Sequence, residues 1–201
     1  MKRIICSIFL VVSFLSFSQN ERSQIVEIAE SEAKTAASIS VFSPNSNTGN
    51  YDVTYHQLEF TLDPNVAFIS GVVTTTFTAK ESLSQIIFDL DDNMTVTSVT
   101  QNSSPLSFTQ NSNDELIITL LSSLNQGDSS SVSITYSGNP ESSGFGAFEQ
   151  TTHNGDPIIW TLSEPYGAKS WWPCKQDLND KIDLIDVYIT TPQFNPSSEE
   201  Y

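Results

Sequence analysis

The sequence predicts an all-β fold, an antiparallel curved sheet or β-sandwich, because a two-residue periodicity begins at Tyr51 and continues almost to the end of the chain. Apolar and polar residues alternate, and many positions carry Thr, Val or Ile, which favour strands. Turn sequences such as Asp-Pro, Asp-Asp-Asn and Gly-Asn-Pro separate these stretches. No helical pattern lies between them, which favours a sandwich or one broad sheet.

The predicted strands follow one another in order along the chain. Their alternating positions are Leu58, Phe60 and Leu62; Ile69, Gly71, Val73, Thr75 and Phe77; Ile86, Phe88 and Leu90; Leu106 and Phe108; Leu116, Ile118 and Leu120; Val132, Ile134 and Tyr136; Ile158, Trp160 and Leu162; and Ile185, Val187 and Ile189. The alternation changes phase between Tyr55 and Leu58, which predicts a β-bulge near His56 and Gln57.

The first residues are typical of a cleavable signal peptide. Lys2 and Arg3 precede an apolar run, Ile4 to Phe17, and small residues around Ser18 offer a cleavage site. The run is shorter than the roughly 20 apolar residues of a membrane span. We therefore expect residues 1–18 to be removed and the protein to be secreted or periplasmic, with no membrane span.

A short leader precedes the predicted sheet. Residues 19–50 combine a weak helical stripe, which includes Ile25 and Ile28, with a Pro-, Asn- and Ser-rich linker from Ser43 to Asn50. The β domain is expected to span residues 51–192, and residues 193–201 are expected to begin a further domain.

Composition excludes one class of partner and one kind of cross-link. The 201 residues carry a net charge of −16, which repels phosphate backbones, so nucleic-acid binding is not expected. Cys6 would leave with the signal peptide, so Cys174 would remain without an internal disulfide partner. We interpret Cys174 as a small buried apolar residue.

The sequence offers little catalytic or metal-binding chemistry. His56 and His153 lie far apart, and no H-E-x-x-H zinc motif is present, so neither is expected to bind metal. His56 is interpreted as a surface or bulge residue. Asp89, Asp91 and Asp92 lack the spacing of a calcium loop and are interpreted as a solvated turn.

One segment, Trp160 to Asp183, differs from the rest of the chain. It contains all three Trp residues, the remaining Cys and three of the few basic residues. Trp171 to Cys174 are expected to form a hydrophobic plug that closes the sandwich. Glu164 follows an apolar strand among aromatic residues, so its carboxylate must either pair or serve a ligand.

This segment resembles the end of the N-terminal domain of zinc aminopeptidases of the aminopeptidase N and leukotriene A4 hydrolase type. The resemblance covers S-E-P-Y-G-A-K-S-W-W-P-C-K-Q-D and, less specifically, the first two strands from Tyr51. Glu164 falls on the family's amine-binding position and Ala168-Lys169 on its Ala-Arg pair. The family's aromatic-Pro-Cys and later Asp and Lys fall on Trp172-Pro173-Cys174, Asp177 and Lys181.

The resemblance implies the substrate-anchoring domain of an exported zinc metallo-aminopeptidase, a hydrolase that removes N-terminal amino acids from peptides. Glu164 would bind the free amine of the peptide, with Tyr166 and Gly167 lining the same pocket. Catalytic residues and zinc would come from a C-terminal catalytic domain, and this chain would supply none of them.

Two positions depart from the family pattern, because Leu162 stands where Gln is frequent and Lys169 replaces an Arg that could bind in bidentate fashion. The family's substrate and zinc motifs are absent from the sequence. We therefore expect a chain truncated before the catalytic domain and inactive by itself.

A second reading is a secreted glycan-binding or adhesion module. Trp160, Tyr166, Trp171 and Trp172 would then form an exposed platform on which sugar rings stack. The exposure of the Trp side chains discriminates between this platform and the plug.

Overall fold

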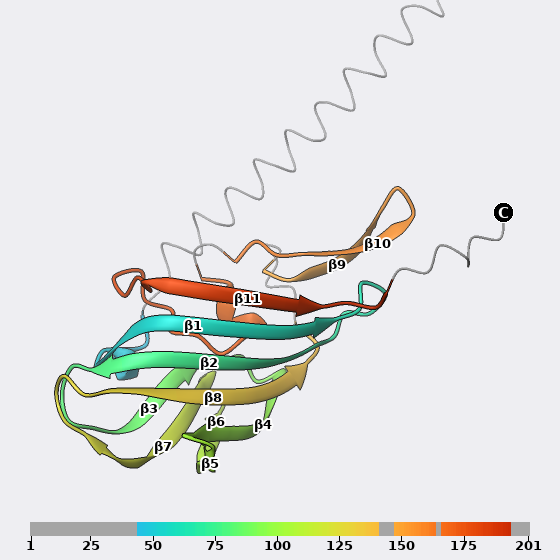
Figure 1. Cartoon of the computed structure of the whole chain (residues 1–201). Helices are drawn as coiled ribbons and strands as arrows, with labels where there is room; N and C mark the ends of the chain where they lie inside the picture. Colours follow the sequence, from blue (N-terminus) through green and yellow to red (C-terminus); the bar gives the residue numbers. More distant parts are fainter. Residues whose placement is uncertain (1–43, 141–146, 164–165, 194–201) are drawn as a thin grey trace, which may run out of the picture. The chain divides into compact units, whose positions relative to one another are not determined.

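The computed structural model describes residues 44–140, 147–163 and 166–193 (Figure 1). The predicted signal peptide, the helical leader, Glu164 and residues 194–201 lie outside the described residues. The elements are η1 (Ser46–Thr48), β1 (Tyr51–Leu62), β2 (Ile69–Ala79), β3 (Leu83–Asp89), β4 (Met94–Gln101), β5 (Ser104–Pro105), β6 (Phe108–Asn111), β7 (Glu115–Leu124), β8 (Ser129–Gly138), β9 (Glu149–His153), β10 (Asp156–Trp160), η2 (Ala168–Ser170) and β11 (Leu184–Thr190).

The largest sheet has six strands in the order β11-β1-β2-β8-β4-β5. Its strands pair antiparallel, as the sequence predicts, except at one edge. There β11 runs parallel to β1, with Leu58 opposite Val187 and Phe60 opposite Ile189. The prediction of consecutive antiparallel strands was wrong at this edge, because alternation defines which face a residue occupies and not the direction of its neighbour.

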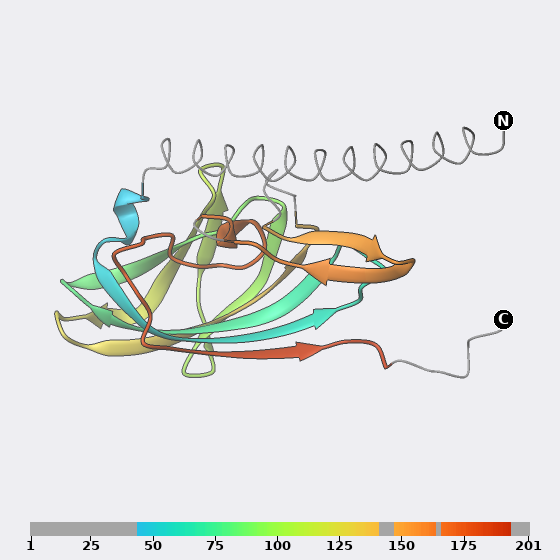
Figure 2. The same cartoon turned by 90° about the horizontal axis from the view of Figure 1, so that it is seen from above.

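A second sheet, in the order β3-β7-β6, packs over one face of the first and completes a sandwich (Figure 2). The core between them combines Val73 and Phe77 of β2 with Phe88 of β3 and Ile118 of β7, all fully buried. Burial of each large apolar side chain contributes about 1.5–3 kcal/mol. A separate hairpin of β9 and β10 lies between β8 and β11 along the chain. The all-β prediction is confirmed.

The bulge in β1 lies two to three residues earlier than predicted. The register with β2 shifts between Val53 and Tyr55. After this bulge, His56 is the first residue of β1 whose side chain faces the core. His56 is therefore buried rather than superficial, with 3% of its surface exposed. Its Nδ1 lies 2.9 Å from the Thr75 hydroxyl, and that hydrogen bond makes a buried imidazole tolerable.

The segment before β1, interpreted as a linker, contacts the folded sheets. Asn45 donates to the Asp89 carboxylate at 3.1 Å and to the Glu115 carboxylate at 3.0 Å, and Thr48 is buried. Asp89 is thus not part of a solvated turn, and burial raises the pKa of its carboxyl group. Hydrogen bonds from Asn111 and Asn47 lower the pKa of Glu115.

Within the described residues, the structure contains no helix whose length and apolar character would let it cross a membrane.

Candidate functional site

The candidate site is the turn that leaves β10, on which the sequence places Glu164. Its two ends are joined by a hydrogen bond, from the Gly167 backbone N–H to the Ser163 carbonyl at 2.8 Å. Ser163 Oγ accepts from Trp171 Nε1 at 2.7 Å and donates to the Ala147 carbonyl at 3.2 Å. Ser163 is thereby held to the aromatic segment and to Ala147, and Gly167 is held to Ser163. Glu164 itself lies outside the described residues.

Gly167 is required at this turn by packing. A Cβ atom there would lie 2.7 Å from Ala147 Cβ, closer than real contacts allow, and 3.1 Å from Ser163 Cα, which is tighter than most. The φ of Gly167 is −85°, which any residue can adopt, so backbone conformation does not demand glycine. Tyr166 and Gly167 are both half-buried.

The aromatic segment after η2 packs inward, as the plug interpretation predicts. Trp171 contacts Phe60 and Phe148, with ring centroids 5.4 and 5.8 Å apart, and Trp172 meets the His56 ring edge-on at 5.1 Å. Cys174 is a buried free thiol, and burial raises its pKa. Because Trp171 and Trp172 are partly buried against the core, they do not form the exposed platform that glycan stacking requires.

Lys169, which replaces the family's Arg, forms ion pairs with two carboxylates. Its Nζ lies 2.8 Å from Asp91 and 2.5 Å from Asp114, which follow β3 and precede β7. Burial alone would lower the pKa of Lys169, but these two carboxylates outweigh it and raise the pKa. Two monodentate contacts to separate turns suit an ammonium group, and they fasten η2 to the sandwich.

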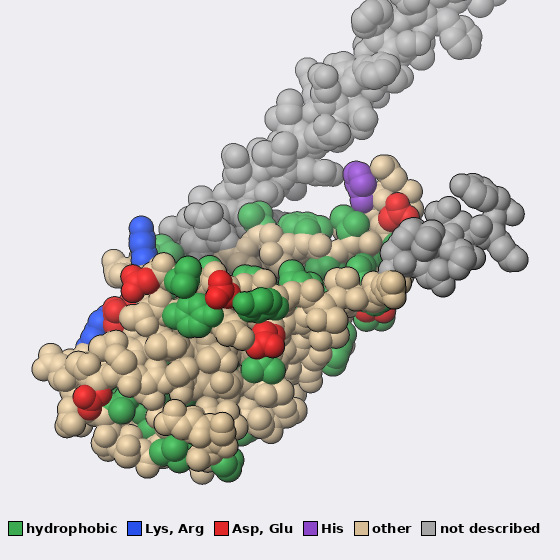
Figure 3. All heavy atoms as spheres, viewed as in Figure 1, with side chains coloured by type: hydrophobic (Ala, Val, Ile, Leu, Met, Phe, Trp, Pro, Cys, Tyr) green, Lys and Arg blue, Asp and Glu red, His purple; other side chains and the backbone are tan. Residues whose placement is uncertain are grey.

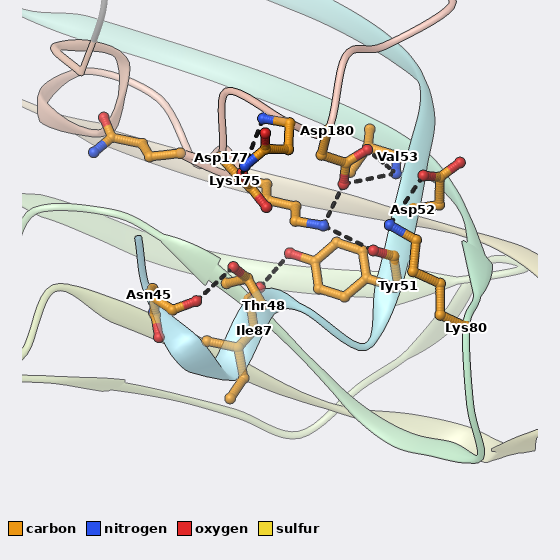
Figure 4. Close-up of polar contacts among 12 residues, drawn as sticks. Asn45, Thr48, Tyr51, Asp52, Val53, Lys80, Ile87, Lys175, Asp177 and Asp180 are labelled. Atoms are coloured by element: carbon orange, nitrogen blue, oxygen red, sulfur yellow. Dashed lines mark hydrogen bonds and ion pairs between the residues drawn. The ribbon is translucent and has the colours of Figure 1, made fainter. Parts of the chain in front are cut away.

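A buried ion pair lies just beyond, between Lys175 and Asp180 (Figure 4). Both side chains are 2% exposed. Lys175 Nζ also donates to the Tyr51 carbonyl at 2.7 Å and lies 4.6 Å from the centroid of the Tyr51 ring. Asp180 accepts from the Val53 backbone N–H at 3.3 Å. The pair therefore fixes the segment after Cys174 to the start of β1.

The sequence interpretation did not single out this pair. It emphasised Asp177, which accepts from the Asn179 backbone N–H within its own turn, and Lys181, which is exposed. Lys175 and Asp180 are five positions apart, a spacing that predicts no contact in irregular backbone. The partner groups on Tyr51 and Val53 lie more than a hundred positions away.

The described residues do not fit a zinc ion. In ranges 44–140, 147–163 and 166–193, no three His, Cys, Asp or Glu side chains gather in a metal-binding arrangement. His56 Nδ1 is engaged by Thr75 in the core, whereas His153 lies exposed at the end of β9. No step of a reaction can be assigned to zinc on these residues.

The chain is similar to solved metallopeptidase structures. One is a two-domain M1 zinc metallopeptidase bound to L-arginine, with 28% identity and a TM-score of 0.63; the match covers 71% of this chain and 33% of that one. Another, from Deinococcus radiodurans and bound to a Tyr-Ser-Ala substrate, shows 27% identity, a TM-score of 0.63, and 72% and 33% coverage. The chain thus spans about one third of the length of these relatives.

A more distant likeness concerns the fold alone. Leukotriene A4 hydrolase from Saccharomyces cerevisiae is 20% identical, with a TM-score of 0.60 and coverage of 74% of this chain and 24% of that one. No curated protein matches the chain. A family model, the peptidase M1 N-terminal domain, matches residues 47–178. The chain therefore belongs to the peptidase M1 family and carries the N-terminal domain of that family.

Proposed function

We propose that this chain is the substrate-anchoring N-terminal domain of an exported zinc metallo-aminopeptidase, in which Glu164 binds the free amine of a peptide. The observation that carries the proposal is the hydrogen-bonded turn around Glu164. Ser163 and Gly167, the described residues on either side of the segment that contains Glu164, are joined by a hydrogen bond, and Ser163 is held to Trp171. Family membership supports the peptidase class, and relatives bound to Tyr-Ser-Ala and to L-arginine support a ligand with a free amine.

The chemistry follows from charge. A peptide α-amine has a pKa of about 7.7–8.0, so it is mostly cationic at neutral pH. In this proposal the Glu164 carboxylate pairs with that ammonium group and so sets where the first peptide bond of the substrate lies. A blocked N-terminus or an internal peptide segment lacks the cation, so the same carboxylate excludes both.

The remaining parts of the proposal concern zinc and export. Zinc, supplied by a catalytic domain, would polarise the scissile carbonyl and activate water. The present residues contribute orientation and selection of the amine.

The signal-like residues 1–18 support export, and exported protein that retained Met1 would contradict it. A reading frame that continues past Tyr201 into an H-E-x-x-H segment is expected, and a stop codon there would contradict the two-domain enzyme.

In that two-domain enzyme, Glu164→Val is expected to lower kcat/KM for an amino acid anilide by about 10- to 100-fold, because a hydrogen bond to a charged group contributes about 1.5–3 kcal/mol. Steady-state hydrolysis of the anilide measures the effect. The variant should also discriminate less between the free anilide and its N-acetylated form. The acetylated substrate has no ammonium group, so its hydrolysis does not depend on Glu164.

Two glycine variants separate the turn from the general stability of the domain. Gly167→Ala would force the turn away from Ala147 and should also lower kcat/KM, whereas Gly49→Ala has open space, with its nearest contact at 4.0 Å. Unchanged kcat/KM in Glu164→Val would remove Glu164 from the site. An equal loss in both glycine variants would show that the turn has no special role.

A further inference from the structure

The outer face of the six-stranded sheet, which points away from the second sheet, is covered with hydroxyl groups. On β2 and β8, core residues alternate with residues of this face, and nine of the ten outward positions carry Ser or Thr. They are Ser70, Thr74, Thr76, Thr78, Ser129, Ser131, Ser133, Thr135 and Ser137, with Val72 as the exception. Uncharged polar side chains and backbone accordingly dominate the surface over β2 and β8 (Figure 3). We call these ten residues the hydroxyl face.

An exposed sheet face normally carries long charged side chains, and this one has almost none. Across the six described strands of this sheet, no Lys or Arg occurs, and the charged residues are Asp52, Glu59 and Asp186. Short hydroxyl side chains lose less conformational entropy than Lys or Glu when a ligand fixes them. The hydroxyls of Thr74 and Ser133 already share a cross-strand hydrogen bond of 2.8 Å. The face is therefore ordered before any ligand arrives.

A hollow of about 290 Å³ lies where this face meets β1 and β11. Its lining includes Glu59 and Thr61 of β1, Ser70 of β2, Thr135 of β8 and Tyr188 of β11. Glu59 lies opposite Tyr188, and Thr61 lies opposite Ser70, so these side chains share the outer face of the sheet. The volume is close to the lower end of the range for small-molecule sites, about 300–1,000 Å³.

The hollow combines an aromatic ring with several hydrogen-bonding groups. Tyr188 is 57% exposed, which leaves its ring available to a ligand. The exposed Glu59 carboxylate accepts from Gln57 Nε2 with one oxygen, at 2.6 Å, and has further lone pairs that can accept from a ligand hydroxyl. An aromatic ring beside hydrogen-bonding groups suits a molecule with one apolar face and a polar rim, as a sugar ring has.

We propose that the hollow binds a neutral oligosaccharide, with one sugar ring against Tyr188 and its hydroxyl groups hydrogen bonded to Glu59 and Thr61. Sugar hydroxyls donate and accept hydrogen bonds, as Ser and Thr do, so the two sets of groups can satisfy one another. This inference goes beyond the proposed function, because neither Glu164 nor its turn takes part in the binding.

Charge and polarity favour this ligand over other classes. A phosphate, sulfate or carboxylate group would meet carboxylates and no basic side chain on these strands. A protein partner would find Val72 as the single apolar residue of the hydroxyl face, whereas the cores of protein interfaces are depleted in Ser. The carboxylates of Glu59 and Asp186 already accept from the neutral groups of Gln57 and Tyr55, which suits hydroxyl donors better than a cationic peptide.

The first test is isothermal titration calorimetry of the purified protein with tetrasaccharides of glucose, galactose, mannose and N-acetylglucosamine. At least one of the four should bind, and its sulfated derivative should not. Tyr188→Ala should weaken that binding about tenfold, because ring stacking is lost. Trp160→Ala is the matched control, since it removes a ring that is 41% exposed on the β9–β10 hairpin, and it should leave the affinity unchanged.

A second pair of variants tests the hydrogen bonds. Thr61→Val replaces a hydroxyl in the hollow by a methyl group of the same shape and should weaken binding about two- to tenfold. Thr109→Val makes the same change at an exposed position of β6, in the other sheet, and should have no effect. Equal losses in Thr61→Val and Thr109→Val, or in Tyr188→Ala and Trp160→Ala, would overturn the proposal.

Nuclear magnetic resonance of the unaltered protein gives a result even where a variant folds poorly. Saturating tetrasaccharide should shift the backbone amides of Glu59, Thr61 and Ser70, and shifts confined to other strands would contradict the site. No binding of any of the four tetrasaccharides at millimolar concentrations would refute the proposal. Binding of tetralysine in their place, lost in Tyr188→Ala, would identify a cationic peptide as the occupant and refute it as well.

Discussion

Replacing Lys175 with methionine is expected to lower the free energy of unfolding by about 3–5 kcal/mol, because the Asp180 carboxylate would stay buried without its counter-charge. The two side chains are each 2% exposed, so water cannot replace the lost partner. The Tyr51 carbonyl would lose its hydrogen bond from Lys175 as well. Urea unfolding followed by tryptophan fluorescence measures the change, which is a large part of the 5–15 kcal/mol of a typical domain.

A second Lys–Asp pair in the same region provides the control. Lys80 and Asp52 lie 3.1 Å apart, with both side chains 48% exposed, so Lys80→Met should cost at most about 1 kcal/mol. In the double variant Lys175→Met/Asp180→Leu, much of the stability should return, because no buried charge remains. A Lys175→Met protein as stable as the Lys80→Met protein would show that the buried pair does not hold the segment to β1.

Acidification from pH 7 to pH 4 is expected to cost about 3 kcal/mol of stability through His56 alone. Burial lowers the pKa of His56 from 6.5 to about 4. As pH falls below 6.5, the unfolded chain binds a proton at this residue and the folded chain does not. Proton binding therefore stabilises the unfolded state relative to the folded state. The loss ends near pH 4, where the folded protein also binds the proton. Unfolding free energies measured by urea at several pH values give the profile.

His56→Gln serves as the control, since glutamine can hydrogen bond to Thr75 but carries no titratable group. The free energy of unfolding of the wild type minus that of this variant should fall steadily between pH 6.5 and pH 4. The titration of Asp89 and Glu115 affects both proteins alike and cancels in this difference. A constant difference across this range would mean that His56 is already protonated, or accessible to water, in the folded protein.

The sequence predicts the strands well because alternation depends on local packing. The stretches around Phe60 and Ile134 lie in β1 and β8, and the plug at Trp171 and Trp172 is confirmed, since both rings pack against the core. The parallel pairing of β11 was not predictable, because a two-residue period is the same for both strand directions.

The buried polar residues were misjudged for a different physical reason. His56 and Asp89 are tolerated inside because partners from distant positions satisfy them, Thr75 in one case and Asn45 in the other. The partners of Lys175 and Asp180 at the start of β1 are equally remote in sequence. Only folding brings such groups together, so residue type alone assigned them to the surface.

The pairing of the first strand with the last has a consequence for the order of folding. Tyr55 and Asp186 share a hydrogen bond although 131 positions separate them, so this edge of the sheet cannot close until the residues of β11 have been synthesised. Long loop closure slows folding, and a ribosome delivers β1 well before β11. During that interval the edge of β1 is an unpaired template for aggregation. A chaperone that shields nascent β1 would therefore act at the most vulnerable stage of synthesis.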